Sequence, residues 1–152
     1  MLHVFSKDGY LFSPVSVVPL PHQMNNLYRH KLKVLIVEDS KLIAGRIKSM
    51  LSDNKDISVV GEAVDYNEAM DLIESEIPHV VLLDIRLPGI GGMDVLKEIK
   101  QKHVNTKVIM LTGHYEHYYR KICRKAGADY FFDKATEFEK IPEVLISMLP
   151  VK

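Results

Sequence analysis

The sequence predicts a doubly wound α/β fold, in which helices cover both faces of a parallel five-stranded sheet. The prediction rests on three observations. Short apolar segments alternate with segments of helical spacing from Leu32 onward. The apolar segments contain few polar residues, which is typical of strands that are buried on both faces. The alternation itself favours parallel strands that are joined by right-handed helical crossovers.

The expected strands are short and strongly apolar. In the first, Lys33 is the one charged residue, and the third is apolar at all of its positions. We expect the five strands at residues 32–37, 57–63, 80–83, 108–111 and 130–132.

Capping residues mark the first two expected helices. Ser40 is placed to cap a helix whose apolar residues follow helical spacing between 42 and 51. Asp65 and Glu68 form an acidic variant of the capping box before the second helix. Pro78 follows that helix and cannot continue it.

The remaining expected helices follow the third, fourth and fifth strands. One covers residues 93–103 and the next covers residues 115–126. Gly127 suits the left-handed position at the end of the latter. Thr136 and Glu139 form a capping box that predicts the start of the last helix.

Five alternating units suit the flavodoxin-like strand order 2-1-3-4-5. In such folds the ligand site lies at the carboxyl ends of the strands, near the point where the strand order reverses. In this sequence, specific polar residues follow four of the apolar strands: Glu38 and Asp39, Asp84, Thr112, and the pair 133–134. Strands 1, 3, 4 and 5 are adjacent in that order, so we expect these side chains to meet at one edge.

The chemistry of these residues favours a phosphoryl site. Glu38, Asp39 and Asp84 are three acids in one place, which is unfavourable unless a cation compensates them. A few hard oxygen ligands select Mg²⁺, which keeps several waters and accepts a phosphate oxygen. Lys134 can neutralise a transferred phosphoryl group, and Thr112 offers a hydroxyl donor. A carboxylate nucleophile beside a metal ion and a lysine is suited to forming an aspartyl phosphate.

Four stretches of the chain resemble the receiver domain of bacterial two-component response regulators. They read VLIVEDS at 34–40, VVLLDIRLPG at 80–89, VIMLTG at 108–113 and GADYFFDK at 127–134. The resemblance covers residues 32 to about 149, and its motifs occur in order at the ends of the expected strands.

The resemblance implies roles for the acids. Asp84 accepts a phosphoryl group from a phosphohistidine on a sensor histidine kinase or a histidine phosphotransfer protein. Glu38 and Asp39 bind Mg²⁺ together with Asp84 and the backbone carbonyl of Arg86. Phosphorylation adds about −1.5 to −2 charges and strong hydrogen-bond acceptors at this point.

The resemblance also implies how phosphorylation is read. Lys134 pairs with Asp84 and then with the phosphoryl group, Thr112 turns inward to bond a phosphoryl oxygen, and Phe131 is the switch aromatic residue. The output surface then consists of the helix at 115–126, the fifth strand and the last helix. A downstream protein would recognise this surface, and a phosphorylation-dependent homodimer is an open alternative.

The sequence departs from the pattern of this family in three places. Ala135 stands where proline usually follows the lysine, so we expect no cis peptide bond there. Phe131 lacks the hydroxyl of the more common tyrosine, so its positions should depend on packing alone. Arg86 and His114 occupy the variable positions that control the lifetime of the phosphoryl group.

The helix at 115–126 is basic and rich in tyrosine. Its cations are Arg120, Lys121, Arg124 and Lys125. They form either a solvated face or a partner-binding surface. Lys plus Arg and Asp plus Glu are both 20, so the chain has no net charge, which disfavours direct contact with nucleic acid.

Residues 1–31 match nothing in this family, and we expect them to be a flexible extension of a receiver domain at 32–152. Gly9–Tyr28 lacks charged residues, but its prolines and polar side chains argue against a membrane span. Met24 would serve as a natural start, so we expect residues 1–23 to be dispensable. A single cysteine, Cys123, and the lack of a signal-peptide pattern favour a cytoplasmic protein.

Three functions are consistent with the sequence. The preferred one is a stand-alone response regulator, because the last helix should end near Leu149 and leave no room for an output domain. The alternative is a receiver separated from a DNA-binding transcription regulator. The third is a phosphatase with an aspartyl nucleophile, but Arg86 stands where the general acid of that chemistry is usually found. We therefore expect no enzymatic activity beyond phosphorylation and dephosphorylation of the chain itself.

Overall fold

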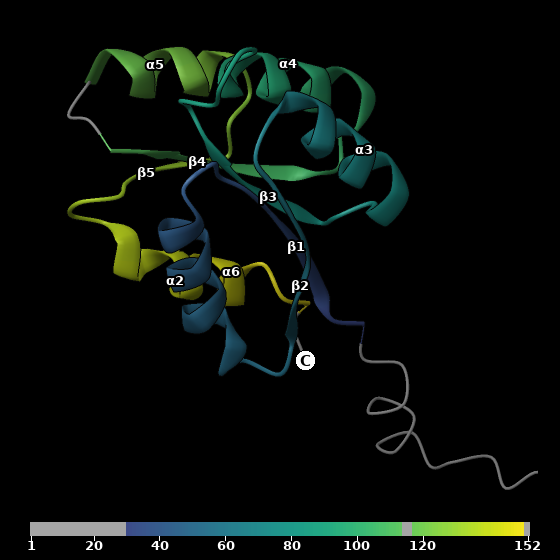
Figure 1. Cartoon of the computed structure of the whole chain (residues 1–152). Coiled ribbons are helices and arrows are strands. Elements are labelled where there is room, and N and C mark those ends of the chain that lie inside the picture. Colours follow the sequence, from purple (N-terminus) through teal and green to yellow (C-terminus); the bar gives the residue numbers. More distant parts are fainter. Residues whose placement is uncertain (1–29, 114–116, 151–152) are drawn as a thin grey trace, which may run out of the picture. The chain divides into compact units, whose positions relative to one another are not determined.

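A computed structural model describes residues 30–113 and 117–150. In this part of the chain, five parallel strands form one sheet in the order β2-β1-β3-β4-β5, so the predicted order is confirmed (Figure 1). The strands are β1 (Leu32–Val37), β2 (Ile57–Ala63), β3 (Val80–Asp84), β4 (Lys107–Thr112) and β5 (Tyr130–Asp133). The helices are α2 (Lys41–Ser52), α3 (Tyr66–Glu76), α4 (Gly92–Lys102), α5 (His117–Lys125), the short 3₁₀ helix η1 (Phe138–Lys140) and α6 (Ile141–Ser147).

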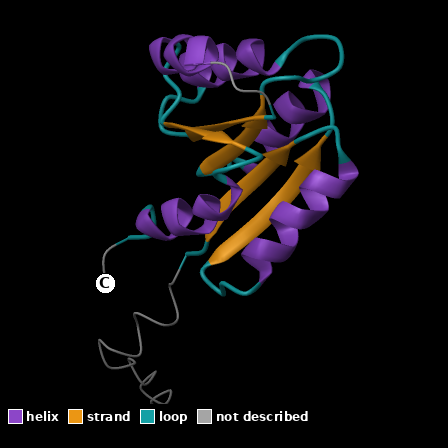
Figure 2. Cartoon of the chain, turned by 90° about the vertical axis from the view of Figure 1, so that its left-hand side faces the viewer, coloured by secondary structure: helices purple, strands orange, loops and turns teal. Residues whose placement is uncertain are grey.

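The sheet lies between two layers of helices, with α2 and α6 on one face and α3, α4 and α5 on the other (Figures 1 and 2). Neighbouring strand residues point to opposite layers, as Leu82 and Leu83 of β3 illustrate. Leu82 packs in the core with Ile47 of α2, whereas Leu83 packs with Leu96 of α4. Because both faces are buried, each central strand needs an uninterrupted apolar run.

Local capping fixes where α2 and α3 begin, as predicted. The Ser40 hydroxyl accepts a hydrogen bond from the Ile43 N–H at 3.4 Å. The Asp65 carboxylate accepts one from the Glu68 N–H at 2.9 Å. The Glu68 carboxylate in turn accepts a hydrogen bond from the Val64 N–H at 3.0 Å, one residue earlier than the capping box requires. Gly127 has a φ of 99°, which confirms the expected left-handed end of α5.

The capping box predicted for the last helix is wrong. Residue 140, not Thr136, is the N-cap of α6, and it makes no side-chain capping bond. Glu139 instead pairs with Arg46 of α2 at 3.1 Å. Burial of Phe138 draws this segment into the core as a 3₁₀ turn, and α6 then starts with a proline in its first turn, where no N–H is needed.

Asp129 ties α4 to the amino-terminal ends of β4 and β5. Its carboxylate accepts hydrogen bonds from the Lys100 ammonium and from the backbone N–H of Val108, both at 2.8 Å, and lies 3.4 Å from the Lys107 ammonium. Burial by itself raises the pKa of Asp129, but these bonds and the two lysine charges outweigh it and lower the pKa below its usual value. The ionised carboxylate therefore stabilises the fold.

We expect Asp129→Asn to lower the free energy of unfolding by about 1–3 kcal/mol at neutral pH. A lowered folded-state pKa contributes stability above the unfolded pKa, and this contribution is lost as pH falls through the folded-state value. The difference in the free energy of unfolding between the variant and wild type should therefore become smaller below about pH 4. Urea unfolding followed by circular dichroism at neutral and acidic pH measures this difference. Asp71→Asn, which removes an exposed acid from α3, is the control. An equal difference in the free energy of unfolding at both pH values would contradict the prediction.

Residues 1–29 and 114–116 lie outside the described part of the chain. The expectations for the amino-terminal extension, for Met24 as a start and for His114 therefore stay predictions. Among the described residues, none of the helices combines the length and the apolar character that crossing a bilayer demands.

Candidate functional site

The polar residues predicted to meet at the carboxyl edge of the sheet do meet there. Glu38 and Asp39 directly follow β1, Asp84 ends β3 and Thr112 ends β4. The pairing of β1 with β3 and of β3 with β4 brings these ends side by side. Lys134 follows β5, and its backbone N–H donates to the Thr112 carbonyl oxygen at 2.7 Å.

The three acids form one cluster. Carboxylate oxygens of Glu38, Asp39 and Asp84 all lie within 4.8 Å of one another. Glu38 and Asp84 are buried, whereas Asp39 is exposed. Backbone N–H groups orient the two buried acids: Ser40 donates to Glu38 at 3.1 Å and Arg86 donates to Asp84 at 3.1 Å. The cluster is thus a preformed set of oxygen ligands that is open to solvent on one side.

Lys134 supplies the positive charge of the site. Its ammonium lies 3.2 Å from the Asp84 carboxylate and also forms an ion pair with Glu38. The side chain of Lys134 is largely buried, so these pairs are little screened by solvent. The loop that carries it is held by Asp133, whose carboxylate accepts a bond from the Ala135 N–H at 2.7 Å. The bond between Lys134 and Ala135 is trans, as the sequence predicts.

One lysine does not balance three neighbouring acids. Burial raises the pKa of Glu38, and the charge of Asp84 raises it further, although hydrogen bonding and charge from Lys134 lower it in part. The net pKa of Glu38 is above its usual value. A second cation would relieve this repulsion, and clustered carboxylates are the donor set of a hard divalent ion. The residues present therefore fit Mg²⁺.

Gly92 brings the start of α4 against Asp84. A β-carbon at this position would lie 2.0 Å from the backbone oxygen of Asp84 and 3.0 Å from the Cα of Ile85. The Gly92 N–H also donates to the Ile85 carbonyl at 2.9 Å. Only glycine permits this approach, so Gly92 allows α4 to begin directly against the end of β3.

The other predicted residues surround the cluster at different depths. Thr112 is buried at the end of β4, and the Arg86 side chain is exposed beyond β3. Phe131 is half-buried against the layer of α3, α4 and α5. The Arg120 guanidinium lies 5.1 Å from the centre of the Phe131 ring, so packing alone does not set the position of this ring.

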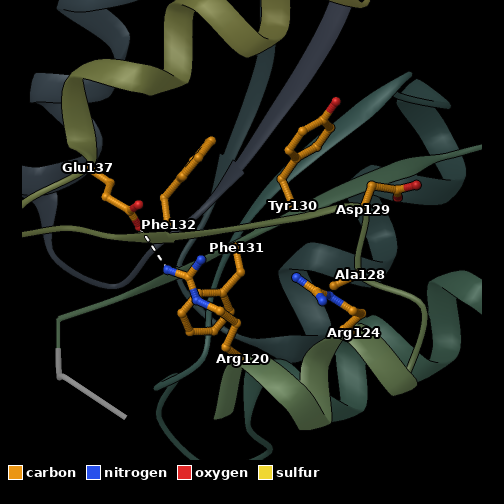
Figure 3. Close-up of a pocket in the computed structure, with 8 residues that line it drawn as sticks. All are labelled: Arg120, Arg124, Ala128, Asp129, Tyr130, Phe131, Phe132 and Glu137. Carbon is orange, nitrogen blue, oxygen red and sulfur yellow. Dashed lines mark hydrogen bonds and ion pairs between the residues drawn. The ribbon is translucent and has the colours of Figure 1, made fainter. Parts of the chain in front are cut away.

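Sequence reasoning missed Glu137. Its carboxylate accepts a bond from the Asp133 N–H at 3.0 Å and pairs with Arg120 of α5 at 3.0 Å (Figure 3). The Asp133 bond contributes most to lowering the pKa of Glu137, and hydrogen bonds from Lys140 and Arg120 together with the Arg120 charge lower it further. Arg120 is thus not simply part of a solvated basic face. The four-residue spacing between Asp133 and Glu137 was the available signal, but the contact with Arg120 depends on how α5 packs.

A carboxylate cluster with one buried lysine lies at the carboxyl edge of a five-stranded doubly wound sheet, which is where open α/β folds place their ligand sites. The model of the response regulator receiver domain family matches residues 34–146. The chain therefore belongs to the family of response regulator receiver domains, as the sequence motifs predict.

Similar proteins support this membership. The response regulator UvrY of Escherichia coli is 32% identical over 117 residues, which are 77% of this chain and 54% of UvrY. The DNA-binding transcriptional activator EvgA of E. coli is 28% identical over 103 residues, 68% of this chain and 50% of EvgA. The chain thus spans about half the length of these curated relatives.

Solved receiver structures share the fold. A LuxR-family DNA-binding response regulator from Staphylococcus aureus superposes with a TM-score of 0.70 at 30% identity, covering 78% of this chain and 98% of that one. The signal receiver domain of the response regulator NarL from Mycobacterium tuberculosis superposes with a TM-score of 0.72 at 29% identity. This match covers 78% of this chain and 95% of that one.

Proposed function

We propose that this domain is a phosphorylation switch in which Asp84 accepts a phosphoryl group from a phosphohistidine. The observation that carries the proposal is the position of the Asp84 carboxylate, which lies beside Glu38 and Asp39 and 3.2 Å from the Lys134 ammonium. This arrangement combines a nucleophile, a cation-binding acid pair and a fixed positive charge.

In the transfer step, an oxygen of Asp84 attacks the phosphorus of the phosphohistidine. A P–O bond forms, the P–N bond breaks, and the imidazole of the donor leaves with the electron pair. Lys134 lies where it can neutralise charge on the phosphoryl oxygens, and the Thr112 hydroxyl can donate to one of them. Glu38, Asp39, Asp84 and the Arg86 carbonyl would hold Mg²⁺, which would supply further charge neutralisation.

The proposal is tested by incubating the protein with a small-molecule phosphodonor such as acetyl phosphate and Mg²⁺. We expect the intact mass to increase by one phosphoryl group, and the adduct to be released by hydroxylamine, as an acyl phosphate is. Chelation of Mg²⁺ should suppress the reaction, since the acid cluster then lacks its compensating cation. Uptake that is unaffected by a chelator, or an adduct that resists hydroxylamine, would contradict it.

Mg²⁺ should also stabilise the folded domain, because the acid cluster exists only in the native state. Binding to the native state adds about 2.7 kcal/mol when the ion is present at a hundred times its dissociation constant. We expect Mg²⁺ to raise the melting temperature of wild type and of Asp94→Asn, an exposed acid on α4, but far less that of Asp39→Asn. An equal rise in all three proteins would indicate a nonspecific salt effect.

We further propose that α5, β5 and α6 form the output surface. Phe131 and Lys134 belong to β5 and the loop after it, so a phosphoryl group on Asp84 acts directly on this part of the domain.

The phosphoryl donor is a sensor histidine kinase or a histidine phosphotransfer protein, and a downstream protein binds the output surface. On this proposal the domain works in the cytoplasm and turns over no free phosphomonoester, because Arg86 replaces the general acid that a phosphatase of this kind uses.

A second candidate is a receiver that controls an attached DNA-binding module. It is favoured by the relatives that this chain matches over about half their length, one of which is a DNA-binding transcriptional activator. The mass of the protein in its source cells distinguishes the two candidates: a mass of 17.4 kDa supports the stand-alone switch, and a markedly larger mass supports the second candidate.

A further inference from the structure

A pocket of about 320 Å³ lies along β5, which is the edge strand of the sheet (Figure 3). Arg120 and Arg124 reach into it from α5, and Glu137 lines it from the other side. Tyr130, Phe131 and Phe132 of β5 also line it, and Tyr130 is 41% exposed. The Phe131 ring lies beside Arg120, whereas the rings of Tyr130 and Phe132 stack on the other side of the strand. The pocket thus combines two guanidinium groups with aromatic rings.

Within the described part of the chain, the charge that stays unpaired in this pocket is positive. Glu137 already accepts bonds from Arg120, Lys140 and the Asp133 N–H. Asp129, also at the pocket, is held by Lys100. Arg124, by contrast, is exposed and forms no ion pair with any residue that the structure describes. An acidic ligand therefore meets one guanidinium that has no ion pair among the described residues and one that is shared with Glu137.

The charge distribution favours an acidic partner over a second copy of this chain. A two-fold symmetric contact places the same patch against itself. The basic residues of α5 would then face each other, while the acids that could oppose them, Asp129 and Glu137, are already paired. A partner segment that carries carboxylates beside an apolar side chain satisfies both the guanidinium groups and the aromatic rings.

We propose that this pocket binds an acidic segment of a partner protein, in which one carboxylate pairs with Arg124 and another competes with Glu137 for Arg120. Glu137 also holds the Asp133 N–H, one residue before Lys134, whose ammonium lies 3.2 Å from Asp84. Displacing Glu137 from Arg120 therefore alters the hydrogen bonding of the loop that carries Lys134. Binding and phosphorylation are then coupled in both directions, and this coupling, unlike the binding itself, rests on the proposed function.

The binding is tested on the full, unphosphorylated chain with a labelled peptide in which glutamates flank one phenylalanine. Amide chemical shifts should move at β5 and α5, and a peptide with glutamines in place of the glutamates should bind at least about tenfold more weakly. Arg124→Gln should weaken binding about tenfold, and Glu137→Gln should strengthen it, because Arg120 loses its competitor. Lys48→Gln, which removes an exposed cation of α2, is the matched control and should change nothing.

Four outcomes would overturn the proposal. The glutamate peptide could fail to bind at millimolar concentration, or the glutamine peptide could bind as tightly as the glutamate peptide. Arg124→Gln could bind the peptide as tightly as wild type, or Lys48→Gln could lose as much affinity as Arg124→Gln. Tighter, Arg124-dependent binding of a single-stranded oligonucleotide would assign the pocket to nucleic acid instead.

The coupling has its own test. Beryllofluoride with Mg²⁺ stands in for a phosphoryl group, and its binding is followed separately through the amide shift of Asp84. Bound beryllofluoride should change the affinity of wild type for the glutamate peptide severalfold. The affinity of Glu137→Gln for the same peptide should stay nearly constant. If beryllofluoride fails to bind, the proposed function is wrong while the peptide site stands. If it binds and both proteins respond alike, the coupling through Glu137 is wrong.

Discussion

Asp84→Asn will take up no measurable phosphoryl group from acetyl phosphate and Mg²⁺, while wild type is modified. The amide of asparagine has nearly the shape of the carboxylate but lacks its nucleophilic oxygen and its charge. The side chain is buried at the end of β3, and the Arg86 N–H that bonds its Oδ1 can equally bond an amide oxygen. The variant should therefore fold, and its failure should be chemical.

The design of this experiment separates a lost nucleophile from a lost fold. Asp94→Asn removes a nearby exposed acid from α4 and should be modified at the wild-type rate. Circular dichroism and the melting temperature show that Asp84→Asn is folded. Intact mass gives the extent of modification with time. If Asp84→Asn gains the same mass at the wild-type rate, the phosphoacceptor is another residue, and Glu38 and Asp39 become the candidates to replace next.

The same variant reports on the electrostatics of the site. Because the charge of Asp84 raises the pKa of Glu38, Asp84→Asn should lower that pKa. The Lys134 ammonium then has one acid fewer to pair with, and its interaction with Glu38 should strengthen. A carbon-detected NMR titration of the Glu38 carboxyl measures the change, and a pKa that stays constant would contradict the like-charge coupling.

Gly92→Ala should lower the free energy of unfolding by about 2–4 kcal/mol. The added β-carbon would lie 2.0 Å from the Asp84 carbonyl oxygen and 2.9 Å from its carbonyl carbon, so backbone rather than a flexible side chain must move. Either α4 shifts away or the end of β3 bends. In both cases the Asp84 carboxylate leaves its position, and we expect phosphoryl uptake to slow as well.

Gly45→Ala is the matched control for this substitution. Gly45 lies inside α2, and a β-carbon there meets nothing within 4 Å. Alanine is preferred over glycine inside helices by about 0.5–1 kcal/mol, so this variant should be more stable than wild type. The chain contains no tryptophan, so urea unfolding is best followed by circular dichroism. Equal stability of Gly92→Ala and wild type would show that the contact between α4 and β3 is not tight.

Much of the candidate site could be predicted because its residues stand at the ends of apolar strands. The short apolar run Val80–Leu83 has the length of a buried strand rather than of a helix, and Asp84 directly follows it in sequence. Parallel strands place their carboxyl ends together, so Glu38 and Lys134 met there although 96 residues separate them. The prediction needed the strand order but no detail of side-chain packing.

Other features could not be predicted because they depend on how helices dock on the sheet. The capping box at Thr136 and Glu139 satisfied a local pattern, but burial of Phe138 and the pairing of Glu139 with Arg46 overrode it. The contacts of Arg120 with Glu137 and with the Phe131 ring depend on the position of α5 over β5. The clash that makes Gly92 necessary appears only once α4 lies against Asp84.

The alternation of strands and helices and the polar residues at the strand ends could be predicted from the sequence alone, and together they narrowed the strand order to a few possibilities. These follow from hydrophobic period and capping, which act over a few residues, and from the uniform hand of parallel crossovers. Packing of the helices on the sheet determined most of the other ion pairs. It gave Lys134, whose pairing with Asp84 the family resemblance implied, a second partner in Glu38. It also placed Glu137 against Arg120 and left Arg124 without a partner among the described residues. Ion pairs act over a few ångströms, so they are fixed only after packing has set the distances between elements.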